Sequence, residues 1–160
     1  MNEVPNYLKK TFKPENMSFI SYGLNKENFY EQFINDKYGK VSKTGHYDIF
    51  DYENNEILIE IKNRNNTYDA YSTTMVGINK IEKGLLDTRN VYFLFGFNDG
   101  SLFEWKLDKT KTYDGKTYTE FSSSNYTTFN KHKLNYYIPI KELTCLISPP
   151  KPVCLIRRNC

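Results

Sequence analysis

Asp48, Glu60 and Lys62 are charged residues within two otherwise apolar segments, 46–50 and 57–62. Two carboxylates brought close together in such surroundings repel each other, and one of them holds its proton unless a cation joins them. A divalent metal resolves that conflict, and a lysine beside the carboxylates can orient or deprotonate a water molecule. The pattern therefore indicates a metal site, provided that the chain brings these three side chains together.

A β-hairpin is the element that would do so. Both segments alternate like strands, and the polar residues between them are a natural place for the chain to reverse. If the turn centres on Asn54, Asp48 lies directly opposite Glu60, and directly opposed residues share one face, which also carries Lys62. Apolar residues on both faces of 57–62 predict a covered strand. The simpler alternative is that Glu60 and Lys62 form a solvated surface pair that contributes little to stability.

Two helices and a buried strand are predicted around this hairpin. Apolar residues repeat at helical spacing over 25–38 and again over about 72–87, and 91–95 is a continuous apolar run of strand length. The expected order is helix, hairpin, helix, strand. This order predicts an α/β (α+β) fold with a central mixed β-sheet flanked by helices.

The remaining chain is rich in turn signals. Hairpins are predicted at Asn98-Asp99-Gly100 and at Asp114-Gly115, and a last strand over 134–140. With 160 residues, of which 39% are hydrophobic, the chain is long enough to bury one sizeable core. We expect a single domain over 1–160, made of a core over about 25–97, a β-rich extension over 98–148 and a tail over 149–160.

An Asp on one strand and Glu-X-Lys on the next, between two helices, resembles the PD-(D/E)XK nuclease superfamily over the predicted core. One departure is Tyr47, which stands before the aspartate in place of the motif's proline. The resemblance implies a restriction-endonuclease-like fold and hydrolysis of phosphodiester bonds with Mg²⁺, for which Mn²⁺ can substitute. It implies Asp48, Glu60 and the carbonyl of Ile61 as metal ligands, with Lys62 acting on the attacking water or on the transition-state charge.

Further site residues follow from the same resemblance. Many members place a glutamate from the first helix at the site, and we choose Glu31 over Glu27 because it lies nearer the hairpin in sequence. Lys80, in the second predicted helix, is expected to contact a phosphate, although a helix lysine is more often simply solvated. Lys43 and Arg64 are further candidates for binding the substrate.

The composition fits an intracellular nucleic-acid enzyme. A formal net charge of +3 permits a polyanionic partner without demanding one. The three cysteines lie near the C-terminus without the paired spacing of a zinc site, which predicts reduced thiols in a soluble, intracellular protein. No apolar run is as long as a membrane span, so no membrane partner is expected.

The leading hypothesis is a metal-dependent DNA endonuclease. Two alternatives stay open: a catalytically inactive nucleic-acid-binding or assembly module on the same fold, and a small α+β domain in which Lys62 simply neutralises Glu60. The sequence leaves open whether the substrate is DNA or RNA, whether cleavage is internal or terminal, and whether two copies pair as a homodimer.

Overall fold

The computed structural model describes residues 30–117 and 134–149. The chain divides into two compact units, Met1–Val41 and Ser42–Cys160. In the first unit, residues 30–38 are helical, and Gly39 follows with a φ of 82°, the left-handed conformation in which many helices end. The predicted end of the first helix is confirmed, while its predicted start at Asn25 lies outside the described residues.

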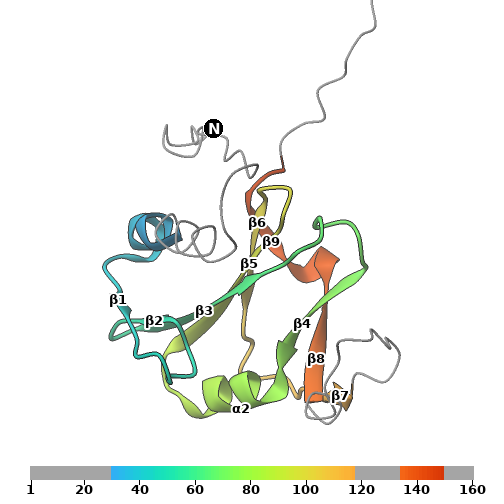
Figure 1. Ribbon diagram of the computed structural model, residues 1–160. Coiled ribbons are helices and arrows are strands. Elements are labelled where there is room, and N and C mark those ends of the chain that lie inside the picture. Colours follow the sequence, from blue (N-terminus) through green and yellow to red (C-terminus); the bar gives the residue numbers. More distant parts are fainter. Residues whose placement is uncertain (1–29, 118–133, 150–160) are drawn as a thin grey trace, which may run out of the picture. The chain divides into compact units, whose positions relative to one another are not determined.

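A mixed sheet of six strands organises the second unit, in the order β1-β2-β3-β5-β6-β9 (Figure 1). Its strands are β1 (Ser42–Lys43), β2 (Tyr52–Glu53), β3 (Ile57–Asn63), β5 (Asn90–Gly96), β6 (Leu102–Lys106) and β9 (Thr144–Ile147). Strands β3 and β5 are parallel, whereas the other neighbours are antiparallel. The apolar run of β3 predicts a covered strand, and Leu58 and Ile59, which point to opposite faces, are both buried.

A second sheet, of three antiparallel strands, lies beside α2 (Figure 1). Its order is β4 (Thr73–Gly77), β8 (Leu134–Pro139) and β7 (Lys116–Thr117), and a 3₁₀ turn, Ile140–Glu142, follows β8. Helix α2 (Ile78–Leu86) continues directly from β4 and leads into β5. The chain therefore leaves β3, passes through β4 and α2, and returns to the parallel neighbour of β3.

The core contains apolar side chains from both sheets and from α2. Phe93, Trp105, Val76 and Ile81 are among its buried members. Burying a large apolar side chain contributes roughly 1.5–3 kcal/mol relative to leaving it exposed, so this core is the main source of the unit's stability. The mixed α/β class predicted from the sequence is confirmed.

The predicted start of the second helix is wrong. Residues Thr73–Gly77 form β4, in which Thr74 and Val76 are buried and pair with Ile138 and Tyr136 of β8. The β-branched side chains in this segment favour an extended strand, and pairing with a distant strand outweighs the helical spacing. The predicted end holds, since α2 ends at Leu86.

Of the predicted hairpins, the first is present and the second is wrong. The turn over 98–100 joins β5 to β6, with Gly100 at a φ of 83°. Residues 109–113, however, form no strand, because Tyr113 packs edge-on against Trp105 at a centroid distance of 5.8 Å. Strand β7 pairs with β8 instead.

Over residues 30–117 and 134–149, no helix has the length and apolar character needed to cross a membrane.

Candidate active site

Asn54 determines where the hairpin between β2 and β3 reverses. Its side-chain carbonyl accepts hydrogen bonds from the N–H groups of Glu56, at 2.9 Å, and Ile57, at 3.0 Å. Its own N–H donates to the Ile57 carbonyl at 3.1 Å. Such side-chain bonds are typical of Asx turns. The reversal therefore falls after Asn54 rather than on it.

This shift changes which aspartate adjoins the strand of Glu60. Tyr52 pairs with Ile59, and Asp51, the residue before Tyr52, hydrogen-bonds to Ile59 and Ile61 on either side of Glu60. The predicted pairing of Asp48 with Glu60 is wrong, because the turn chemistry displaces the register and a displacement by an odd number of residues exchanges faces.

Asp51 lies at the point where β2 separates from β3. Its N–H donates to the Ile59 carbonyl at 2.9 Å, and its Oδ2 accepts from the N–H of Ile61 at 2.7 Å. The carboxylate thus takes the place that a backbone carbonyl would occupy if the ladder continued. Alternate residues of a strand direct their backbone groups to the same side, so the carbonyl of Ile61 is on the side where Asp51 lies.

Glu60 is a carboxylate inside the core. It is 1% exposed, and its Oε1 forms ion pairs with Nζ of Lys62 and, at 2.6 Å, with Nζ of Lys80. Its Oε2 is also buried and has no hydrogen-bond partner among the described residues. An unpaired buried carboxylate oxygen is costly, and a cation bound there would remove that cost.

The two lysines reach Glu60 from different elements. Lys62 lies two residues beyond Glu60 on β3, and Lys80 lies in the first turn of α2. Their side chains remain 33% and 21% exposed, so both lysines are only partly buried. The crossover through α2 brings Lys80 to β3, and its predicted contact with a phosphate stays a prediction.

A groove of about 530 Å³ opens beside these lysines. Lys62, Arg64 and Lys80 contribute cations to its lining, and Asn79 and Asn135 contribute amides. The groove also contains the start of α2, whose N-cap residue Gly77 supplies no capping side chain. Unpaired N–H groups at a helix start and nearby cations both favour an anion.

Arg64 has a structural part within that lining. Its Nε donates to Thr74 Oγ1 at 3.1 Å, its Nη2 donates to the Met75 carbonyl, and its guanidinium lies 5.5 Å from the ring centroid of Phe95. Burial lowers the pKa of Arg64, although an arginine remains protonated in a protein. Arg64 therefore fastens β4 to the main sheet and leaves its charge beside the groove.

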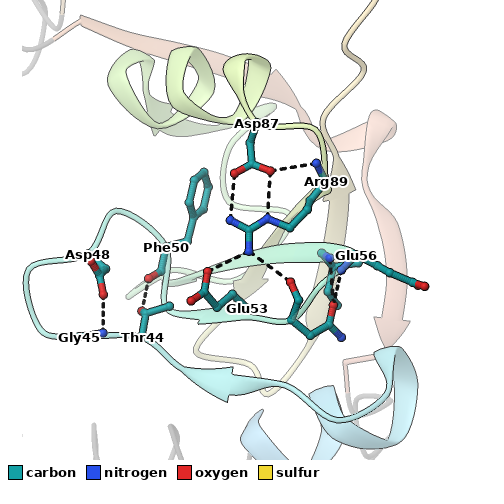
Figure 2. A network of polar contacts seen from close by, with 10 residues as sticks. Thr44, Gly45, Asp48, Phe50, Glu53, Glu56, Asp87 and Arg89 are labelled. Atoms are coloured by element: carbon teal, nitrogen blue, oxygen red, sulfur yellow. Dashed lines mark hydrogen bonds and ion pairs between the residues drawn. The ribbon is translucent and has the colours of Figure 1, made fainter.

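Asp48 lies on the exposed loop between β1 and β2 rather than on a strand (Figure 2). Its Oδ2 accepts from the N–H of Gly45 at 2.6 Å, and its own N–H donates to the Gly45 carbonyl at 3.0 Å. Thr44 closes the loop base through a hydrogen bond from its hydroxyl to the Phe50 carbonyl. The predicted strand over 46–50 is therefore wrong, because these local bonds stabilise a turn.

Arg89 holds the hairpin to the loop after α2 (Figure 2). Its guanidinium pairs with Asp87 Oδ2 at 2.9 Å and with Glu53 Oε2 at 2.9 Å, and it also donates to the Asn54 carbonyl. Hydrogen bonding to Arg89 lowers the pKa of Asp87 to about 2. This network fixes the turn that sets the register of Asp51.

Two predicted site residues, Glu31 and Lys43, are not part of the contacts described above. Glu31 belongs to the helical segment 30–38 of the first unit, and its carbonyl accepts from Asn35 Nδ2 at 2.9 Å. Its alternative, Glu27, lies outside the described residues. Lys43 is exposed on β1 and does not line the groove. The roles assigned to Glu31 and Lys43 stay predictions.

The donor set is compatible with a hard divalent cation. Within the part of the chain that the structure describes, no three His, Cys, Asp or Glu side chains form a group able to hold a metal. Mg²⁺, however, is usually bound through only one or two carboxylates and keeps several waters. Asp51, Glu60 and the carbonyl of Ile61 provide oxygens of this kind, and the unpaired Glu60 Oε2 is a free donor.

Asp51 is a candidate site residue that the sequence pattern did not predict. The available signal was Asn54, whose side chain can cap its own turn and so displace the centre of the hairpin.

Comparisons with known proteins returned no match: the sequence fits no protein-family model and matches no curated protein.

Proposed function

We propose that the protein is a metal-dependent nuclease that hydrolyses phosphodiester bonds in DNA inside the cell. The observation that carries the proposal is Glu60, a buried carboxylate whose Oε1 is bound by two lysines and whose Oε2 has no hydrogen-bond partner within the described part of the chain. Glu60 lies on β3 two residues before Lys62, and Asp51 hydrogen-bonds to the same strand. This arrangement supports the resemblance to the PD-(D/E)XK superfamily.

Asp51, Glu60 and the Ile61 carbonyl would hold Mg²⁺ or Mn²⁺, with Asp51 in the role that the sequence pattern gave to Asp48. When bound, the ion supplies Lewis acidity toward the phosphoryl oxygens and lowers the pKa of a coordinated water. Lys62 orients the attacking water or neutralises the charge that develops in the transition state.

Phosphate binding falls to the groove. Lys80 and Arg64 present cations along it, and the start of α2 presents backbone N–H groups. A phosphate there lies within reach of Lys62, which also contacts Glu60. The groove would thus bring a phosphate to the two lysines that contact Glu60.

One observation favours the alternative, a nucleic-acid-binding or assembly module without catalysis. Lys62 and Lys80 already neutralise Glu60, so the acidic group is tolerated without a metal. The two functions differ in whether a metal ion binds at Glu60.

The test combines metal binding with cleavage of a plasmid substrate. We expect Glu60→Gln to lose Mn²⁺ binding measured by calorimetry, and Lys62→Ala to bind Mn²⁺ but lose cleavage by about 10²–10³-fold, since charge stabilisation of this kind contributes several kcal/mol. Glu56→Gln, at the exposed hairpin tip, and Lys83→Ala, exposed on α2, are matched controls.

Circular dichroism must show that each variant is folded. If folded Glu60→Gln binds Mn²⁺ like the wild type, or if the wild type cuts neither DNA nor RNA, the enzyme proposal fails and the binding module is favoured.

A further inference from the structure

The loop 44–51, which joins β1 to β2, is held in one shape by its own hydrogen bonds (Figure 2). Thr44 N–H donates to the Asp51 carbonyl at 3.0 Å, which closes the loop base. At the tip, Gly45 and Asp48 bind each other twice, through a backbone bond of 3.0 Å and a side-chain bond of 2.6 Å. The backbone between these two residues, which carries His46 and Tyr47, is therefore held in one conformation.

The same loop is joined to the candidate active site. Nζ of Lys80 donates to the carbonyl of Ile49, and this nitrogen also lies 2.6 Å from Glu60 Oε1. One ammonium thus contacts both the loop and the buried carboxylate. Tyr47, at the loop tip, is two residues from Ile49 in the chain, so the tip lies near the site rather than at a distant part of the surface.

Tyr47 stands at this tip with 96% of its surface exposed. Its ring meets the exposed His46 ring edge to face, at a centroid distance of 5.2 Å and an interplanar angle of 78°. Single exposed aromatics are common on protein surfaces. A hydrogen-bonded loop that carries an aromatic two residues from the carbonyl bound by the groove lysine Lys80 is a more specific arrangement, because it combines a stacking surface with phosphate contacts.

We propose that Tyr47 stacks on an unpaired base adjacent to the phosphate bound by Lys62 and Lys80, so that the substrate is nucleic acid single-stranded at the cleavage site. This inference rests on the proposed nuclease function. A base inside a duplex is covered on both faces by its neighbours, so stacking on a side chain requires a base that has left the stack. Single-stranded segments, frayed ends and loops provide such bases.

The experiment uses the full chain with Ca²⁺ in place of Mg²⁺ and short oligonucleotides that carry 2-aminopurine, a fluorescent base quenched by stacking. The affinities for a single strand and for a blunt duplex are measured for the wild type, Tyr47→Ala, Tyr47→Phe and Tyr71→Ala. Tyr71 is a matched control, since it is also exposed but belongs to the loop before β4.

We expect Tyr47→Ala to bind the single strand roughly 5- to 150-fold more weakly and to lose the quenching, the range that base–aromatic stacking gives. Tyr47→Phe and Tyr71→Ala should bind like the wild type, and the duplex affinity should change little in any variant. Unchanged single-strand binding by Tyr47→Ala overturns the inference, even if that variant loses binding to another protein.

Cleavage by the wild type in Mg²⁺ separates the two claims. If the wild type cuts nucleic acid while Tyr47→Ala binds and cuts single strands equally well, the stacking role fails and the nuclease function stands. If the wild type neither binds nor cuts any nucleic acid, both fail.

Discussion

Glu60 is a charged side chain that is buried, and the free-energy cost of burying it explains why two lysines lie beside it. Removing a carboxylate from water costs several kcal/mol, which is offset only by close partners of opposite charge. Lys62 and Lys80 supply these partners at one oxygen. The other oxygen has no described partner, so the side chain is suited to receive a cation from solution.

The two aspartates of the hairpin region can be separated by isosteric substitution. Asp51→Asn should reduce Mg²⁺-dependent cleavage by about 10²–10³-fold, because an amide is a poor substitute for an anionic ligand. Asp48→Asn should cleave within a few-fold of the wild type, since an amide oxygen can still accept the Gly45 hydrogen bond. Initial cleavage rates of both variants give the answer, and the reverse order would return the ligand role to Asp48.

At the scale of elements, hydrogen bonds and ion pairs made by turn and loop residues determine the positions of the strands. Asn54 shapes the turn between β2 and β3, and Arg89 joins that turn to Asp87, in the loop after α2. The register of the hairpin and the position of α2 are therefore fixed by one connected set of hydrogen bonds. Weakening this set of hydrogen bonds should lower the free energy of unfolding and disturb the position of Asp51 against β3.

Acid should weaken this connection in a defined pH range. The pKa of Asp87 is lowered to about 2 in the folded protein from 3.8, so its stabilisation is complete above about pH 4 and is lost as the pH falls toward 2. Because Asp87 is 25% exposed, solvent screening reduces the contribution to about 1–2 kcal/mol.

Urea unfolding of Arg89→Ala at pH 7 and pH 3 tests this. The variant should be less stable by about 1–2 kcal/mol at pH 7 and should lose less stability on acidification than the wild type. Lys111→Ala is the control, since its exposed pair with Asp108 spans 3.8 Å and contributes little. Equal acid sensitivity in Arg89→Ala and the wild type would contradict the assignment.

At the scale of the molecule, the route of the chain assembles the site. The path from β3 through β4 and α2 to β5 returns the start of α2 to β3, so that Lys80 meets Glu60. The second sheet then completes the groove through Asn135 of β8. Metal binding should consequently stabilise the whole fold, because the ligands come together only in the folded chain.

Thermal unfolding with increasing Mg²⁺ measures this coupling. At a free concentration of 100 times the dissociation constant, the ion should stabilise the wild type by about 2.7 kcal/mol. Glu60→Gln should show little stabilisation, whereas Glu56→Gln should behave like the wild type. Equal stabilisation of the wild type and Glu60→Gln would place the ion elsewhere.

The sequence by itself determined the mixed α/β class, the buried strand that carries Glu60 and Lys62, and the buried strand over 91–95. Both strands are short apolar segments with apolar residues on both faces, which is a local signal in the sequence. The turn signal at 98–100 was equally local, and the hairpin there is present.

Only the tertiary structure decided which aspartate adjoins the strand of Glu60, that 73–77 is a strand, and that Lys80 contacts the carboxylate. Register depends on the turn that Asn54 builds, and in this register Asp51, rather than Asp48, hydrogen-bonds to β3. Strand β4 and the Lys80 contact depend on partners that lie far away in the sequence. Such partners are chosen by packing, so local spacing cannot reveal them.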